Sequence, residues 1–203
     1  FAKLSEPERN ELWIRNQVSE VWLLMMENLN REELREKETA GGNNAGRVLQ
    51  IMMQYIQTHY ELPITLADIA GAGNISKNTA LRYFREQIRI SPVEYLIQYR
   101  IRMACKMLRE TSEKIAYISV CAGYDNISYF NRSFKKYVGK TIIEYVADLR
   151  LSYAAKLLST TDMSVITVSS SVGYDNSSFF AQKFKNKFKI SPAEYRNSFR
   201  QTD

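Results

Sequence analysis

Side chains that carry out catalysis or bind metals are scarce in this sequence. The 203 residues include a single histidine, His59, and two cysteines, Cys105 and Cys121, which are not at the spacing of a metal site. We find no nucleophile paired with a base, no phosphate-binding glycine loop and no paired acids within one repeat. We therefore expect no enzyme, no metal and no cofactor, and the cysteine content favours a reducing, cytoplasmic setting.

Arginine and asparagine side chains offer a different chemistry. Arg82 and Arg132 stand fifty residues apart, and Asn78 precedes Arg82 by about one helical turn. A guanidinium group donates two hydrogen bonds to guanine, and a carboxamide pairs with adenine, in the major groove of DNA. This chemistry requires a helix that presents such side chains on one exposed face.

A fifty-residue repeat runs through the chain and is typical of tandem structural units. Its matching positions include Phe84, Phe134 and Phe184; Tyr95, Tyr145 and Tyr195; and Arg100, Arg150 and Arg200. The tetrapeptide Gly-Tyr-Asp-Asn occurs at 123–126 and 173–176, whereas the first repeat reads Gly-Asn-Ile-Ser at 73–76. A one-residue slip in the first repeat then aligns Ile69 with Ile118.

Each repeat is predicted to contain a long helix. Ser91, Thr141 and Ser191 are each followed by glutamate at the third position, which is the capping-box pattern of a helix start. The three glutamates, Glu94, Glu144 and Glu194, are therefore interpreted as caps. Arg100, Arg150 and Arg200 further along these helices are either phosphate contacts or packing residues.

A pair of shorter helices precedes each long one. In the second repeat a helix over 114–122 ends before Gly123, and Asn126 caps a helix over 127–138. Apolar residues fall on one face of the later helix, at Phe130, Phe134 and Val138, and predict a buried stripe. A short helix, a glycine turn and a second helix with a buried stripe describe a helix-turn-helix.

The exposed positions of the second helix in each repeat are the candidate DNA contacts. They are Lys77, Asn78, Leu81, Arg82 and Arg85 in the first repeat, Ile127, Ser128, Asn131, Arg132, Lys135 and Lys136 in the second, and Ser177, Ser178, Gln182 and Lys185 in the third. The third set lacks arginine. Lysines at 183, 185, 187 and 189 surround it and favour phosphate contact over base readout, with a solvated helix face as the alternative.

Charge is distributed unevenly along the chain. Residues 1–46 hold six Lys/Arg and nine Glu, a net charge of −3, so the overall charge of +6 leaves +9 for 47–203. An acidic segment followed by a basic one suggests that the basic segment, 47–203, binds a polyanion.

These residues resemble the DNA-binding domain of the AraC/XylS regulators. The second repeat, KIAYISVCAGYDNISYFNRSFKKYVGKTIIEY, carries the family's Ile-Ala pair, its glycine followed by an aromatic residue, and its Phe-Lys-Lys. Ser119, Tyr124 and Ile142 depart from the usual Ala, Phe and Pro. The resemblance covers about 47–200 and implies an all-α fold of tandem, homeodomain-like helix-turn-helix units joined by long linker helices. Two units are usual, whereas this chain has three, so we expect two overlapping copies of the pair.

The resemblance also implies a division of the chain. Residues 1–40 would be the helical end of a missing N-terminal sensing or dimerisation domain, 41–46 a flexible linker, 47–147 the paired DNA-binding domain and 148–203 the third unit. Residues 7–38 are predicted to form one amphipathic helix or a helical hairpin, and its two tryptophans favour homodimerisation through this segment or packing on the missing domain. A small-molecule effector would act only through the missing domain.

The expected function is that of a sequence-specific transcription regulator, by family habit an activator, with double-stranded DNA and RNA polymerase as partners. The expected location is the bacterial cytoplasm, on the nucleoid when bound. No apolar run reaches the length of a membrane helix. Two alternatives remain: units one and two bind DNA while the third binds a protein, or the whole chain is a helical scaffold for protein partners.

Overall fold

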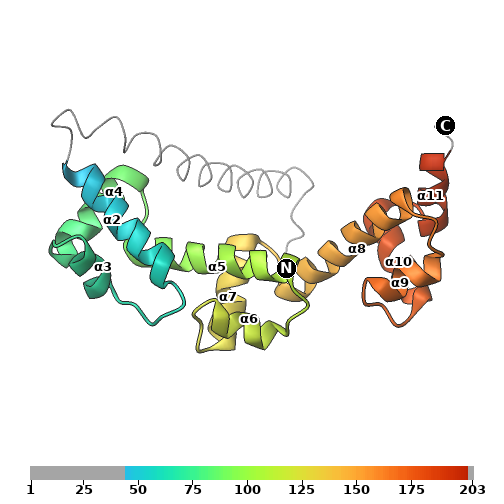
Figure 1. The fold of residues 1–203 in the computed structure, drawn as a ribbon, viewed down its shortest axis with the longest axis horizontal. Helices are drawn as coiled ribbons and strands as arrows, with labels where there is room; N and C mark the ends of the chain where they lie inside the picture. The colour runs from blue at the N-terminus through green and yellow to red at the C-terminus, as the bar shows by residue number, and fades with distance from the viewer. Residues whose placement is uncertain (1–43, 201–203) are drawn as a thin grey trace, which may run out of the picture. The chain divides into compact units, whose positions relative to one another are not determined.

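The computed structural model describes residues 44–200, and every regular element in that range is an α-helix (Figure 1). In chain order the helices are α2 (Asn44–His59), α3 (Leu66–Ala72), α4 (Lys77–Ile88), α5 (Pro92–Glu110), α6 (Ile115–Cys121), α7 (Ile127–Val138), α8 (Ile142–Thr160), α9 (Val165–Ser171), α10 (Ser177–Phe188) and α11 (Pro192–Arg200). The predicted all-α fold class is confirmed. The helix predicted over 7–38 and the segment 1–40 lie outside the described residues.

The chain divides into two compact units after Gly139, and each is described by itself. The described part of the first unit, 44–139, holds a leading helix, α2, and two helix-turn-helix pairs, α3–α4 and α6–α7, joined by the linker helix α5. The second unit holds the linker helix α8, the pair α9–α10 and α11. Helix α8 therefore groups with the pair that follows it, and the predicted boundary at 147/148 falls inside this helix.

Helix α2 begins earlier than expected. Its first turn starts at Asn44, so residues 44–46 of the predicted flexible linker are helical. Gly46 within a helix costs about 1 kcal/mol relative to alanine. The burial of Val48 and Leu49 in the next turn offsets this cost, because each fully buried aliphatic side chain stabilises the fold by about 1.5–3 kcal/mol.

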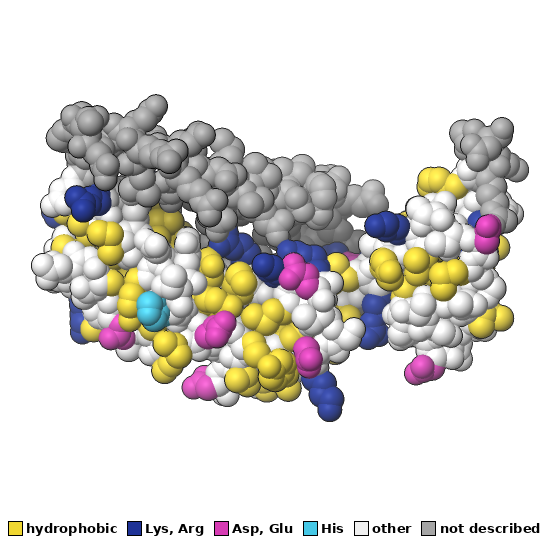
Figure 2. Space-filling model, in the orientation of Figure 1, with side chains coloured by type: hydrophobic (Ala, Val, Ile, Leu, Met, Phe, Trp, Pro, Cys, Tyr) yellow, Lys and Arg dark blue, Asp and Glu magenta, His cyan; other side chains and the backbone are white. Residues whose placement is uncertain are grey.

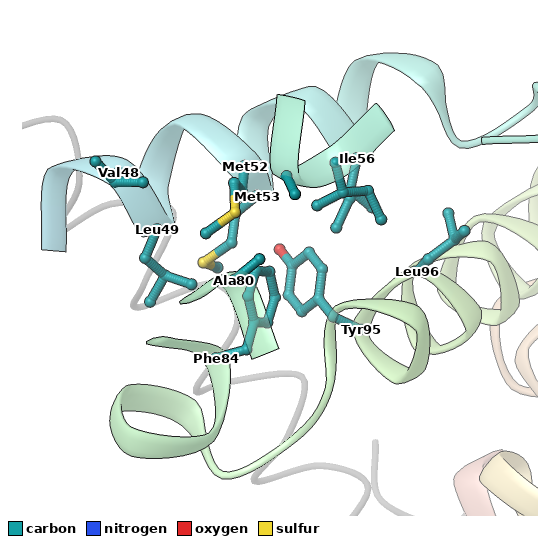
Figure 3. Close-up of a cluster of buried hydrophobic side chains, with 11 residues drawn as sticks. Val48, Leu49, Met52, Met53, Ile56, Ala80, Phe84, Tyr95 and Leu96 are labelled. Atoms are coloured by element: carbon teal, nitrogen blue, oxygen red, sulfur yellow. The ribbon is translucent and has the colours of Figure 1, made fainter. Parts of the chain in front are cut away.

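The first helix-turn-helix packs its core between α2, α4 and α5 (Figure 3). Met52 and Ile56 of α2 are fully buried against Phe84 of α4 and Tyr95 of α5. The rings of Phe84 and Tyr95 meet edge to face, with 5.9 Å between their centroids. Helix α2 thus covers the apolar face of α4 together with α3 and α5, so the leading helix completes the core of the first helix-turn-helix.

Helix α5 contributes to two cores. Its first turns bury Tyr95 and Leu96 in the core just described. Its later turns bury Ile101, Ala104 and Leu108, and this part of the unit packs α5 against α6 and α7. The two helix-turn-helix pairs of the first unit are thus built on one continuous helix.

The predicted aromatic stripes are confirmed. Phe130 and Phe134 of α7, and Phe180 and Phe184 of α10, are completely buried. The rings of Phe180 and Phe184 pack in a tilted arrangement, with 5.6 Å between their centroids, in the core of the second unit. Because these faces are buried, most polar residues of α7 and α10 are left on the outside, whereas Ser133 of α7 is buried.

The turns inside the helix-turn-helix pairs adopt the left-handed conformation. Gly123 and Gly173 have φ values of +80° and +79°, where glycine is favoured because it has no Cβ. Asn74, with φ of +51°, takes the same place in the first pair, since asparagine tolerates this region. The turn bonds Ile75 N–H to Ala70 carbonyl (3.1 Å) and Tyr124 N–H to Ser119 carbonyl (3.0 Å) correspond, which confirms the one-residue slip.

The long helices start at the predicted caps, with one difference. The hydroxyls of Ser91, Thr141 and Ser191 each accept from the backbone N–H three residues later. Glu144 and Glu194 return the bond to the cap backbone at 2.8 and 2.7 Å. The carboxylate of Glu94 instead accepts a long hydrogen bond, 3.4 Å, from the Tyr137 hydroxyl at the end of α7.

Candidate nucleic-acid interface

Helix α4 presents the first set of predicted contacts. Ser76 caps its start by accepting from Thr79 N–H at 3.2 Å. Ala80 and Phe84 hold the buried face, so the opposite face of the helix is exposed. The structure places the five predicted residues on this helix: Lys77, Asn78, Arg82 and Arg85 are exposed, and Leu81 is half-buried. The Arg82 guanidinium lies 5.5 Å from the centre of the Tyr83 ring, which restrains it beside the helix.

Helix α7 presents the second set. Asn126 caps it by accepting from Tyr129 N–H at 2.9 Å. All six predicted residues are exposed: Ile127, Ser128, Asn131, Arg132, Lys135 and Lys136. The Lys136 ammonium donates to the Tyr137 hydroxyl at 3.3 Å, and this hydrogen bond raises the pKa of Lys136. The exposed face of α7 thus combines amide and hydroxyl groups near its start with cations further along.

Helix α10 presents the third set, which is poorer in groups that discriminate bases. Ser177, Ser178, Gln182 and Lys185 are exposed as predicted. Lys187, in contrast, reaches back to α8, where its ammonium donates to the Asp148 carbonyl (2.7 Å) and the Ser152 hydroxyl (3.0 Å). It also lies 3.4 Å from the Asp148 carboxylate. Lys187 is therefore an internal contact, which corrects its interpretation as a phosphate ligand.

The repeated arginines of the linker helices face inward to different extents. Arg100 is half-buried and donates two hydrogen bonds of 2.7 Å to the carbonyls of Tyr60 and Leu62. Arg150 is exposed and donates one hydrogen bond of 3.2 Å to the Gly173 carbonyl. The packing interpretation holds for Arg100, and its burial lowers the pKa of the guanidinium. Arg100 and Arg150 each precede a turn glycine by 23 residues, but this spacing does not indicate the contacts of Arg100 with Tyr60 and Leu62.

The sets on α4 and α7 belong to one compact unit, and the set on α10 belongs to the other. Over the first unit, the face shown in Figure 2 carries mainly apolar and acidic side chains, with Lys and Arg near its edges. Helices α4 and α7 each expose three cations, Lys77, Arg82 and Arg85 on α4 and Arg132, Lys135 and Lys136 on α7.

Other kinds of site find no support in the described part of the chain. Between residues 44 and 200 no group of His, Cys, Asp and Glu side chains is arranged to hold a metal ion. Cys105 is buried and Cys121 half-buried, and both are free thiols. None of the helices in this range is both long and apolar enough to cross a membrane.

Comparison with known protein families finds two matches along the repeated part of the chain. A family model described as a helix-turn-helix domain matches residues 69–145 and again 131–198, which together cover more than half of the chain. The two matches share 131–145, the end of α7 and the start of α8. The first match therefore contains the second helix-turn-helix, α6–α7, in full, whereas the second match begins within α7 and contains the third pair, α9–α10.

Curated relatives match part of the chain. The chain is 33% identical over 85 residues (42% of the chain, 29% of the relative) to an uncharacterized HTH-type transcriptional regulator of Bacillus subtilis. It is 33% identical over 89 residues (44% and 32%) to the lactose operon transcription activator of Staphylococcus xylosus. Both matches span less than a third of the relative. Among solved structures, the C-terminal domain of AraT, a response regulator from Geobacillus stearothermophilus, is 29% identical over half of the chain and 84% of that domain, with a TM-score of 0.48.

Proposed function

Because the chain belongs to the AraC-type helix-turn-helix family, we propose that it is a sequence-specific transcription regulator whose helices α4 and α7 enter successive major grooves of DNA. Family membership also confirms the expectation that the chain is not an enzyme. One observation carries the proposal. Helices α4 and α7 belong to one compact unit, and each has one buried apolar face and one exposed face. The exposed faces carry an arginine at the matching position, Arg82 on α4 and Arg132 on α7.

Base reading is assigned to the first turns of the two helices. Arg82 and Arg132 would donate in pairs to guanine, and Asn78 and Asn131 would address adenine. Lys135, in the last turn of α7, would contact phosphate together with its neighbours Lys136 and, on α4, Arg85. Two units that follow one face of the duplex would cover about 20 base pairs, since each major groove recurs after about 10.

The third helix-turn-helix is assigned to phosphate contact. The exposed start of α10 offers Ser177, Ser178 and Gln182, which are short or neutral groups, and the cation Lys185 follows one turn later. A second assignment, contact with a protein such as RNA polymerase, is favoured by Phe179, whose side chain is 50% exposed on the same turn. The two assignments differ in whether the footprint reaches about 30 base pairs.

Activation of transcription, rather than repression, is the proposed outcome of binding. The relative from Staphylococcus xylosus, 33% identical over 89 residues, is named as an activator of the lactose operon. An effector would act through a domain other than the one described. This part of the proposal is tested by reporter transcription from a promoter that carries the selected site.

Binding-site selection with the whole chain, followed by footprinting, tests DNA binding. We expect one enriched site with two elements about 10 base pairs apart. The double variant Arg82→Ala/Arg132→Ala should lose about 1–3 kcal/mol of discrimination per bidentate contact. The matched variant Gln182→Ala/Lys185→Ala should weaken binding to all sequences equally. No enriched site, or equal losses of discrimination in both variants, would refute the proposed function.

A further inference from the structure

Arg100 lies at a junction between the two helix-turn-helix pairs of the first unit. From the middle of α5 its Nε donates to the Tyr60 carbonyl and its Nη2 to the Leu62 carbonyl, both at 2.7 Å. These carbonyls lie in the segment between α2 and α3, and so belong to the first helix-turn-helix. On its other side the guanidinium lies 5.7 Å from the centre of the buried Tyr124 ring, in the turn between α6 and α7.

The backbone segments at Tyr60 and Gly123 also approach each other closely next to Arg100. A Cβ atom on Gly123 would lie 2.3 Å from the Tyr60 carbonyl oxygen and 2.7 Å from Arg100 Nε. The backbone of the second turn thus approaches the backbone of the first pair closely, and only glycine permits this approach. Segments 40 and 23 residues away from Arg100 in the sequence meet around one side chain.

A guanidinium is suited to this place for chemical reasons. It is planar, carries five donors in a rigid arrangement, and stacks on aromatic rings while it donates at its edge. Arg100 uses two donors on carbonyls just past the end of α2, where the helix dipole favours a cation. Lysine would supply one compact charge and could not hold both carbonyls and the ring at once.

We propose that Arg100 is a positioning residue that fixes α4 relative to α7, and thereby sets the spacing of the two DNA elements that this chain recognises. The inference rests on the proposed function, because it concerns how two helices address one duplex. The side chain is turned inward and does not itself contact DNA. Removing it would free the two pairs to move about α5.

The repeat supplies a matched control in Arg150. This residue stands at the same place in the linker helix α8, fifty positions later, but it is exposed and makes one hydrogen bond of 3.2 Å to the turn of its own unit. A Cβ on Gly173 would lie 3.2 Å from the Arg150 guanidinium carbon, a tight contact that the exposed arginine side chain can relieve by a small shift. Arg150→Ala therefore removes the same chemistry without opening a junction between pairs.

The DNA test measures a spacing penalty, the loss of affinity when five base pairs are inserted between the two elements of the selected site. Five base pairs rotate the second element by about half a turn, so a fixed pair of helices engages only one element. The whole wild-type chain should lose roughly 5- to 150-fold, the value of one bidentate contact. Arg100→Ala and Arg100→Lys should show a penalty at least about threefold smaller, whereas Arg150→Ala should keep it.

A second measurement needs no DNA and separates this inference from the proposed function. Spin labels at Glu86→Cys on α4 and Ala116→Cys on α6, both exposed, report the distance between the pairs in a Cys121→Ser background. Arg100→Lys should broaden the distance distribution and Arg150→Ala should not. A wild-type width in both Arg100 variants, or an unchanged spacing penalty, overturns the positioning role. Failure to select any site refutes the proposed function, and the distance measurement then still decides the role of Arg100.

Discussion

The two linker helices, α5 and α8, have the same length and the same kinds of cap at both ends, but they pack against different numbers of helices. Both contain 19 residues, begin after a Ser or Thr cap and end at a threonine whose N–H donates back into the last turn. Helix α5 packs against α2, α3 and α4 as well as α6 and α7, and its Arg100 joins two helix-turn-helix pairs. Helix α8 belongs to a unit that holds one pair, and its Arg150 is exposed.

The same contrast recurs at other repeated positions. Tyr137 and Lys187 are fifty residues apart, and each reaches back to a linker helix. Tyr137 meets Glu94 at 3.4 Å, whereas Lys187 makes an ion pair and two hydrogen bonds with Asp148 and Ser152. Side chains at matching positions of the repeat therefore point in the same direction, but the residues around them determine which contacts they make.

The largest effect is expected from alanine at the turn glycines. Gly123→Ala should lower the free energy of unfolding by more than about 3 kcal/mol, because the new methyl overlaps a backbone carbonyl as well as requiring a left-handed conformation. Gly173→Ala should cost about 1–2 kcal/mol, mainly for the conformation, because the Arg150 side chain can shift away from the new methyl. Hydrogen exchange would locate the losses in α6–α7 and α9–α10 respectively. Equal losses would remove the distinction between the two turns.

The lysines of α10 separate internal contacts from DNA contacts. Lys187→Ala should cost about 1 kcal/mol of stability, since it removes partly buried hydrogen bonds, and should leave the salt dependence of DNA binding unchanged. Lys185→Ala should leave stability unchanged and reduce the slope of log affinity against log salt by about 0.9. Thermal unfolding and binding titrations at several salt concentrations give both quantities. A reduced slope for Lys187→Ala would return that residue to the DNA surface.

A smaller gain of stability is expected at the ends of α4, α7 and α10. The residue after each helix is left-handed, with φ of +63° at Arg89, +78° at Gly139 and +70° at Lys189. Lys189→Gly should stabilise the second unit by about 0.5–1 kcal/mol, because glycine adopts this conformation without a Cβ penalty. Gly139→Ala, in the first unit, should show the opposite sign. Urea titration distinguishes the two, and a loss in Lys189→Gly would contradict the cap assignment.

The smallest effect is a pH dependence confined to the second unit. Burial raises the pKa of Asp148, but the hydrogen bond from Lys140 and the charge of Lys187 outweigh it, so the pKa lies below its ordinary value. A lowered folded-state pKa stabilises the fold above the unfolded value, near 4, and the contribution disappears as the pH falls through the folded value. After solvent screening we expect no more than about 0.5 kcal/mol.

Asp148→Asn tests this dependence. The variant should unfold with a flatter pH profile below about pH 5 than the wild type, as followed by hydrogen exchange in α8 and α10. Exchange in α5 and α7 serves as the internal reference, because Asp148 belongs to the other unit. An unchanged profile in α8 would show that Lys140 and Lys187 do not stabilise the ionised carboxylate.

Much of the fold could be predicted from short segments. The caps at Ser91, Thr141 and Ser191, the end of α6 before Gly123 and the buried stripe of α7 all depend on residues within about four positions of each other. The exposed positions of α4, α7 and α10 follow from the same periodicity, because a buried stripe leaves the other face outside. The early start of α2 could not be predicted from the sequence, because its first turn is glycine-containing and depends on the packing of the next turn.

For the arginines, too, local sequence and tertiary packing decide different properties. The residues themselves determined the repeat, the helices and the outward placement of Arg82 and Arg132, because these follow from local hydrogen bonds and periodicity. Only the tertiary structure decided that Arg100 joins two pairs while Arg150 faces solvent, and that Lys187 is held by α8. Contacts between segments 35 to 40 residues apart depend on how the helices pack. The identity of a residue at a repeated position does not predict that packing.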